Sequence, residues 1–154
     1  MKTKINNKLI RSFNACYDPS EIGIPDNESL SVKDWVDTYR NLVKNKQDVI
    51  WLLCRNEFLT DRQLRLFACW CAKEAMKLVK NPDPRSLKAI EVAEAFAEGN
   101  VTKEELAAAW AAAGDVAWAA ARAAAWAAAW AAAGDVARAA AGDAQIDRLL
   151  IYFK

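Results

Sequence analysis

The stretch TDRQLRLFACWCAKEAMKLVKNPDPRSLKAIEVAEAFAEGNVTKEELAAAW (residues 60–110) decides the fold, because it contains three signals that start helices. These signals are Thr60 with Gln63, Asp83 with Pro84, and Thr102 with Glu105. A threonine followed three residues later by Gln or Glu forms a capping box, whose side chains accept hydrogen bonds from free amides of the first turn. Aspartate followed by proline is an equally good start. Asn81 and Pro82 end the first of these helices, and Gly99 ends the second.

Apolar residues in the first two helices recur at spacings of three and four, which places them on one face. The expected stripe of the first helix is Leu64, Phe67, Ala68, Cys71, Ala75 and Leu78. The expected stripe of the second is Leu87, Ile90, Val92, Ala93 and Phe96. We therefore expect two amphipathic helices that pack through these faces, with Phe67 and Ile90 in the core.

The sequence before residue 60 predicts further helices. A short amphipathic one is indicated by Leu9, Ile10, Phe13 and Cys16. A loop at 17–30 contains Pro19, Gly23 and Pro25. Ser31 can then cap a helix whose core face holds Trp35, Val36, Tyr39, Leu42 and Val43. The apolar run 49–54 favours a short buried helix ending near Phe58 and Leu59; a strand also fits, but no partner strand is evident. The expected fold is all-α, with at least five helices and no sheet.

The last third of the chain is rich in alanine and tryptophan. Every fourth position from 110 holds a larger residue or a glycine: Trp110, Gly114, Trp118, Arg122, Trp126, Trp130, Gly134, Arg138 and Gly142. The string WAAAGDVA occurs at 110–117 and again at 130–137. Alanine favours helix, but a period of four advances about 40° per step around it, so one straight helix would present tryptophan to every side. We expect breaks at one or more of Gly114, Gly134 and Gly142, or else a partner chain that covers the tryptophans.

Composition limits the classes of function. The 154 residues include no histidine, which removes the commonest general base and metal ligand, so we expect no catalytic site, metal or cofactor. The net charge of +1 gives no signal for nucleic acid. Cys69 and Cys71 point about 200° apart on a helix and cannot share one ion, so we expect these two, Cys16 and Cys54 to be buried, reduced and structural. Charged residues interrupt the longest apolar stretch, so no membrane span is expected.

Length and hydropathy suit one compact domain. A chain of 154 residues with a mean hydropathy of -0.10 can bury a core of its own. We expect a single domain over 1–154, with an amphipathic helical part at 1–100 and an Ala/Trp-rich helical part at 101–154. With no secretory leader before the cysteines, the cytoplasm is the expected compartment.

The chain resembles a family of alanine-rich helical accessory proteins of bacteriophages and prophages, mostly without assigned function. The resemblance covers nearly the whole chain. It rests on CYDPSEIGIP (16–25), DVIWLLCRNEFLTDRQLRLFACWCAKEA (48–75), NPDPRS (81–86), IEVAEAFAEGNVTKEELAAAWAAA (90–113) and DAQIDRLLIYF (143–153). It implies a small accessory protein in the cytoplasm of a bacterial host cell, which acts on host defence by binding rather than by chemistry.

Arginines and tryptophans of the last third are the candidate binding residues. The set is Trp110, Trp118, Arg122, Trp126, Trp130 and Arg138. A guanidinium there can meet a phosphate or carboxylate while an indole stacks on a planar ligand. The alternative is that Arg122 and Arg138 pair with Asp115 and Asp135 and only brace the helices.

Other charged and aromatic residues have ordinary structural interpretations. We expect Trp51 and Trp70 to lie in the core. The group Arg55, Glu57, Asp61, Arg62 and Arg65 is expected to be a solvated charged surface. The carboxylates of Glu91, Glu94 and Glu98 share a helix face, which we also interpret as solvated rather than as a metal site.

Two kinds of function remain. The first is a protein-interaction module that works through a helical surface and forms a homo-oligomer, with a host protein as partner. The second is a sponge-like protein that sequesters a nucleotide-type signalling molecule, motivated by the alternation of Trp118, Arg122 and Trp126. We favour protein interaction, because the spiral of tryptophans is hard to bury in one short bundle.

Overall fold

The chain is helical apart from one small sheet, within the part that the structure describes. The computed structural model describes residues 1–113 and 135–153, with side chains from 140 onward in the second range. The elements are β1 (Lys4–Ile5), α1 (Asn7–Ser12), the 3-10 helix η1 (Pro19–Ile22), β2 (Leu30–Ser31), α2 (Val32–Tyr39), α3 (Lys46–Leu53), α4 (Asp61–Met76), α5 (Pro84–Glu98), a helical segment at 103–113, and α7 (Asp135–Leu150). The expected all-α fold class is confirmed.

A two-stranded sheet corrects the expectation of no strands. β1 pairs with β2 in antiparallel register, with Lys4 opposite Ser31 and Ile5 opposite Leu30. Neither strand is longer than two residues, so no alternation of apolar and polar residues could reveal it. The pairing buries Ile5 completely and connects the N-terminus to the start of α2.

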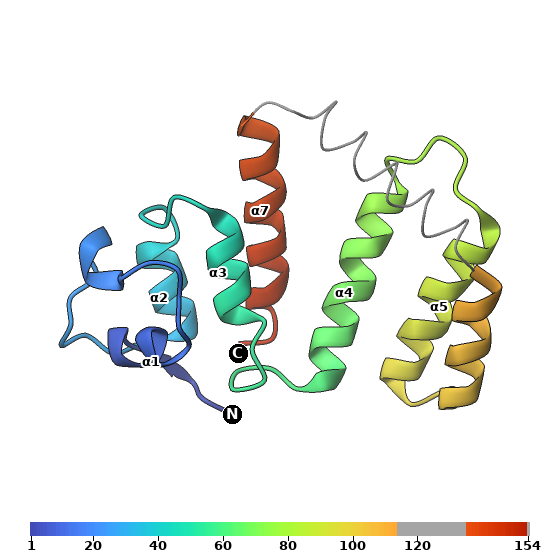
Figure 1. Cartoon of the computed structure of the whole chain (residues 1–154), viewed down its shortest axis with the longest axis horizontal. Coiled ribbons are helices and arrows are strands. Elements are labelled where there is room, and N and C mark those ends of the chain that lie inside the picture. The colour runs from blue at the N-terminus through green and yellow to red at the C-terminus, as the bar shows by residue number, and fades with distance from the viewer. Residues whose placement is uncertain (114–134, 154) are drawn as a thin grey trace. The chain divides into compact units, whose positions relative to one another are not determined.

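The residues divide into two compact units, Met1–Thr60 with Ala139–Lys154 and Asp61–Arg138. Figure 1 shows the helices of the first unit in blue, cyan and red. The core of this unit is built from side chains with at most 1% of their surface exposed: Ile5, Ile10, Trp35, Val36, Val49, Leu52, Leu53, Leu59, Ile146 and Leu149. Ile146 and Leu149 come from α7, so the end of the chain completes the core that the first 60 residues begin.

In the first unit the structure confirms one sequence prediction and contradicts two. The run 49–54 lies in and directly after helix α3, so the helix is confirmed and the strand is wrong. Trp51 on that helix is 37% exposed, which contradicts the prediction that it lies in the core. Cys16 is exposed instead of buried.

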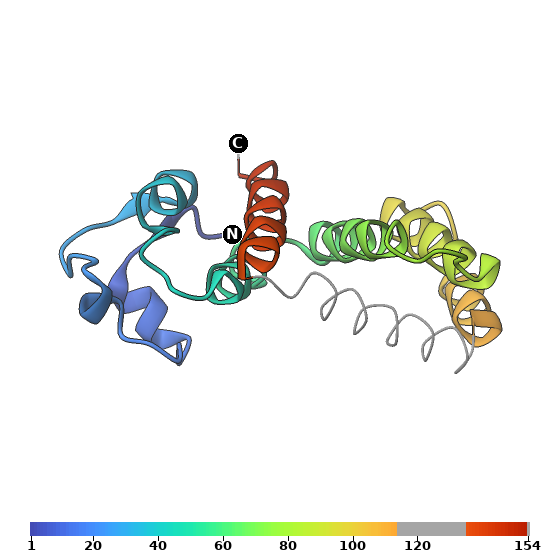
Figure 2. The ribbon, with the colours of Figure 1, turned by 90° about the horizontal axis from the view of Figure 1, so that it is seen from above.

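α7 packs closely against α3, as Figures 1 and 2 both show. Gly142 is buried in the middle of α7, and a Cβ atom placed on it would lie 2.7 Å from the Cβ of Lys46. α7 continues through this glycine, so Gly142 is not one of the expected breaks; here glycine permits a close approach of two helices. Beside it, Asp143 lies 3.3 Å from the Lys46 ammonium, and Asp147 lies 2.5 Å from the Arg40 guanidinium. Gly114 and Gly134, the other two positions at which a break is expected, lie outside the described residues.

The second unit holds α4, α5 and the segment at 103–113. The boundaries of α5 follow the sequence signals, because Asp83 accepts a 2.8 Å hydrogen bond from the Arg85 amide and Gly99 ends the helix with φ of 81°. By contrast, α4 ends at Met76, before the stop predicted at Asn81 and Pro82. The amide of Thr102 donates to Glu105 over 2.7 Å, and the amide of Glu105 donates to Thr102 over 3.2 Å. This reciprocal capping box begins the third helix as expected. None of the described helices is long and apolar enough to cross a membrane.

Candidate functional site

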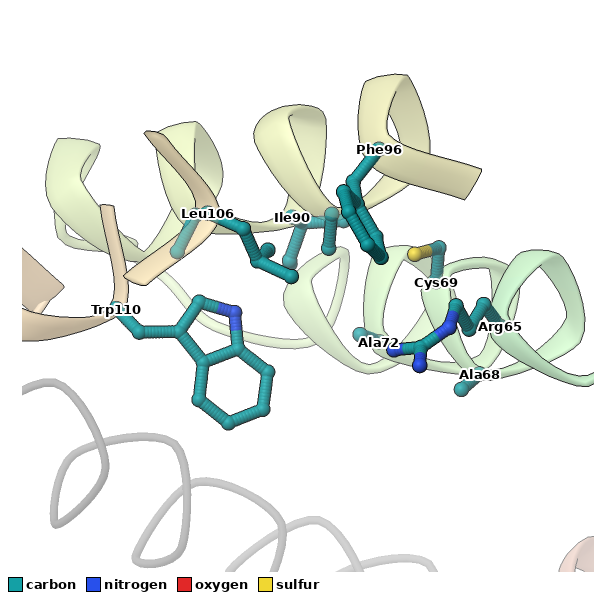
Figure 3. Close-up of a pocket in the computed structure, with 10 residues that line it drawn as sticks. Arg65, Ala68, Cys69, Ala72, Ile90, Phe96, Leu106 and Trp110 are labelled. Atoms are coloured by element: carbon teal, nitrogen blue, oxygen red, sulfur yellow. The ribbon is translucent and has the colours of Figure 1, made fainter. Parts of the chain in front are cut away.

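An apolar groove lies between α4, α5 and the segment at 103–113, all within the second unit. Its volume is about 340 Å³. Figure 3 shows the side chains that line it. They are Arg65, Ala68, Cys69, Ala72, Ala89, Ile90, Ala93, Phe96, Leu106 and Trp110. We call this set the α4–α5 groove.

Alanines create the hollow. Ala68 and Ala72 lie four residues apart on α4, and Ala89 and Ala93 have the same spacing on α5, so each pair forms a strip along one side of its helix. A methyl group fills little of the space between helices whose axes pack about 8–10 Å apart. With Ile90 and Leu106, these small side chains line a hollow that the other described residues leave unfilled.

This groove corrects part of the predicted core. Ala68, Ile90, Ala93 and Phe96 were expected to face inward, but Ala68 is exposed and the other three are only half-buried. Phe67, by contrast, is 7% exposed and packs as predicted. On α5 the predicted stripe shares Ile90, Ala93 and Phe96 with the groove, but on α4 only Ala68 is shared, and the predicted core residues Leu78 and Leu87 are 69% and 39% exposed.

Arg65 supplies a positive charge at the groove. Its guanidinium carbon lies 5.2 Å from the centre of the Phe96 ring, a cation–π contact that holds the side chain over the aromatic face. Elsewhere in this unit Arg62 pairs with Glu98, and Arg85 with Asp83. Among the described residues, no carboxylate lies within 4.0 Å of the Arg65 guanidinium. The predicted solvated charged surface thus includes one arginine that faces an apolar groove.

Cys69 lies in the wall of the groove but is not poised for chemistry. Burial raises the pKa of its thiol, and the nearby Glu94 carboxylate acts in the same direction. Because the thiolate is the nucleophile and the ligand for metals, this thiol stays protonated near neutral pH. The side chain contributes a small apolar surface to the groove instead.

Trp110 is the predicted site residue that the structure places at this groove. Its side chain is 66% exposed, and Figure 3 shows the indole and the Arg65 guanidinium extending into the same open space. The other predicted site residues, Trp118, Arg122, Trp126 and Trp130, lie outside the described residues. Arg138 belongs to α7, but its side chain also lies outside the described part.

Sequence reasoning missed Arg65 as a candidate. Its neighbours Asp61 and Arg62 are charged, so the local composition indicated only a solvated surface. The one available signal was its spacing of three residues from Ala68 and of four from Cys69, which places Arg65 on the edge of the apolar stripe of α4.

The three glutamates of α5 are held in ion pairs. Glu94 pairs with Lys73 and Glu98 with Arg62 across the α4–α5 interface, and Glu91 pairs with Lys88 on its own helix. Within the described ranges, no cluster of acidic, cysteine or histidine side chains could hold a metal ion. Glu94 and Glu98 therefore connect the two helices that form the groove.

The first unit carries a second exposed aromatic side chain, Trp51 of α3. Arg55 lies 4.0 Å from the centre of the Phe13 ring and 5.0 Å from that of Trp51, and it also pairs with Glu57 over 3.4 Å. The expectation of a merely solvated Arg55 is therefore wrong, since its guanidinium is held between two aromatic rings.

Trp70 of the second unit is half-buried and stacks on Phe67.

Comparison with protein-family models, with curated proteins and with solved structures gave no match to this chain. The chemistry of the groove therefore carries the functional argument.

Proposed function

We propose that this protein acts without catalysis, by binding another protein whose apolar side chains enter the α4–α5 groove. The observation that carries the proposal is an open groove with apolar walls and a tryptophan, Trp110, exposed at its edge. Contiguous apolar hollows of this kind on a protein surface are characteristic of binding sites.

Trp110 supplies the apolar surface that a partner would cover. A tryptophan side chain buries about 150–250 Å² when it is fully covered. With 66% of its surface exposed, covering the rest contributes about 2.5–4 kcal/mol at about 25 cal/mol per Å². Tryptophan and arginine are also the residue types that dominate protein interfaces, and Arg65 lies in the same groove.

A nucleotide-type ligand is the second candidate, favoured by the presence of an indole and a guanidinium in one groove. An indole can stack on a base, and a guanidinium can bind a phosphate. A nucleotide, however, brings several charged oxygens that each need a donor, and among the described residues Arg65 is the one cation that lines the groove. The balance of apolar walls and one cation suits a protein surface better.

The resemblance to accessory proteins of phages and prophages adds a class of partner. We propose that the protein acts in the cytoplasm of a bacterial host and that its partner is a host protein of a defence system. This part of the proposal rests on the resemblance alone.

The test is photo-crosslinking in bacterial cells. A benzoylphenylalanine at Ala107, which is exposed one turn before Trp110, should form a discrete adduct with a single protein. The same group at Leu78, 69% exposed and outside the groove, should not form it.

Two variants show whether the adduct depends on the groove. Ala68→Arg fills the groove from an exposed position, and Ala75→Arg places the same side chain at an exposed position of α4 outside it. The adduct should disappear only with Ala68→Arg. An adduct that survives this variant contradicts the proposal. So does a purified protein that carries a bound nucleotide and forms no protein adduct.

A further inference from the structure

We infer that the occupant of the α4–α5 groove is an amphipathic α-helix of the partner, with a carboxylate placed to pair with Arg65. This inference rests on the proposed function, because it specifies which protein surface the groove accepts. It follows from three properties of the groove: the mostly apolar side chains of its described lining, the two strips of alanine, and the charge of Arg65.

The first property is the chemistry of the walls. An extended peptide brings backbone N–H and C=O groups that need partners once water is excluded. Among the described lining side chains, the polar groups are the Arg65 guanidinium, the Cys69 thiol and the Trp110 indole N–H, and the other side chains are hydrocarbon. A helix satisfies its backbone hydrogen bonds internally and needs only an apolar surface. The walls therefore select a helix over a strand.

The second property is shape. The strips Ala68–Ala72 on α4 and Ala89–Ala93 on α5 each span one helical turn and border the same hollow. Small side chains along two helices allow a third helix to approach closely and to insert its larger side chains between them. Leucine or phenylalanine at spacings of three, four and seven on the partner would then contact Ile90 and Leu106.

The third property is charge. The Arg65 guanidinium is fixed over Phe96, with no carboxylate within 4.0 Å among the described residues, whereas Arg62 on the same helix pairs with Glu98. A docked helix removes part of the water around this exposed guanidinium, which then favours an anion at the rim of the interface. A glutamate or aspartate beside the apolar face of the partner helix meets this need. Arg65 thus acts as a specificity residue for acidic amphipathic helices.

The experiment is a selection against the full chain with two displayed peptide libraries. One library consists of 18-residue helices with randomised surface positions, and the other consists of extended peptides with proline at every fourth position. Ala68→Arg serves as the blocked-groove control and Ala75→Arg as its matched exposed variant. Circular dichroism verifies that each variant is folded.

The expected result is enrichment of helices with apolar residues at spacings of three, four and seven and an acid beside them. Binding should be lost with Ala68→Arg and kept with Ala75→Arg. Arg65→Gln should weaken the selected helices about three- to fivefold, as for one exposed charge pair, and Arg62→Gln should not. Arg65→Glu should restore binding to the same helices when their acid is replaced by lysine.

Other outcomes overturn the inference in distinguishable ways. Enriched helices without an acid, or equal effects of Arg65→Gln and Arg62→Gln, overturn the role of Arg65 and leave the proposed function intact. Enrichment of extended peptides overturns the helix and also leaves the proposed function intact. No enrichment from either library, together with no crosslink from Ala107 to any protein other than this chain, overturns the inference and the proposed function together.

Discussion

Replacing Gly142 with alanine should destabilise the first unit, although the same change stabilises most helices. In an exposed helix interior, Gly→Ala gains about 1 kcal/mol. Here the added methyl group would lie 2.7 Å from the Cβ and 3.2 Å from the Cγ of Lys46. Carbon atoms pack best at about 3.5–4.0 Å, so α7 and α3 would have to separate by about 0.8 Å.

Lys46 cannot easily move away from this contact. Its ammonium donates to the carbonyl of Arg40 over 3.0 Å and to the side chain of Asn41 over 2.9 Å, and it lies 3.3 Å from Asp143. Overpacking of a closed contact costs about 1–3 kcal/mol. After the gain in helix propensity is subtracted, the expected net loss for Gly142→Ala is about 1 kcal/mol.

Urea denaturation of the full chain measures this loss as a lower midpoint at unchanged slope. Ala141→Gly, at an exposed position of the same helix, measures the difference in helix propensity between alanine and glycine without the close contact. In a double-mutant cycle, Lys46→Gly removes the contacting Cβ and should reverse the sign of the Gly142→Ala effect. A stabilisation of about 1 kcal/mol by Gly142→Ala alone would refute the close approach of the two helices.

Further predictions concern the second unit and the assembly of the chain. Phe67→Ala should lower the free energy of unfolding by about 3–5 kcal/mol, and Ile90→Ala should lower it clearly less, because Ile90 is only half-buried. Equal losses of unfolding free energy in chemical denaturation would contradict the open groove. Arg85 lowers the pKa of Asp83 from 3.8 to about 2, so the stabilisation by this carboxylate is complete above pH about 4 and is lost as the pH falls toward 2. Asp83→Asn should therefore reduce the loss of stability on the acid side of the pH–stability curve. An unchanged acid side would contradict this linkage. We also expect at least a dimer through residues 110–138, and light scattering that gives 17.1 kDa at tens of micromolar would contradict this.

The candidate site was only partly predictable from the sequence. Trp110 was identified because a large aromatic residue in an alanine tract is conspicuous. Arg65 was not, because its role depends on the Phe96 ring 5.2 Å away, on another helix. The groove itself depends on how closely α4 and α5 pack, a distance that a stripe of apolar residues does not specify.

Local chemistry determined the helix boundaries. Asp83 and Pro84 begin α5, Gly99 ends it, and Thr102 with Glu105 begins the next helix, as the sequence predicts. Each of these signals works through hydrogen bonds or backbone angles within a few residues, so it needs no knowledge of the rest of the chain. The all-α class follows from the same local signals.

Tertiary structure alone decided what each helix face contacts. Gly142 has the same local signal as a helix end, yet it lies inside α7 because Lys46 packs against it. The pairing of Ile5 with Leu30 joins residues 25 apart, and no local pattern marks it. Trp51 is an apolar residue in an apolar run, and it is partly exposed because Val49, Leu52 and Leu53 fill the core side of its helix. Such outcomes depend on the space between elements, and that space is fixed only when residues distant in sequence come together.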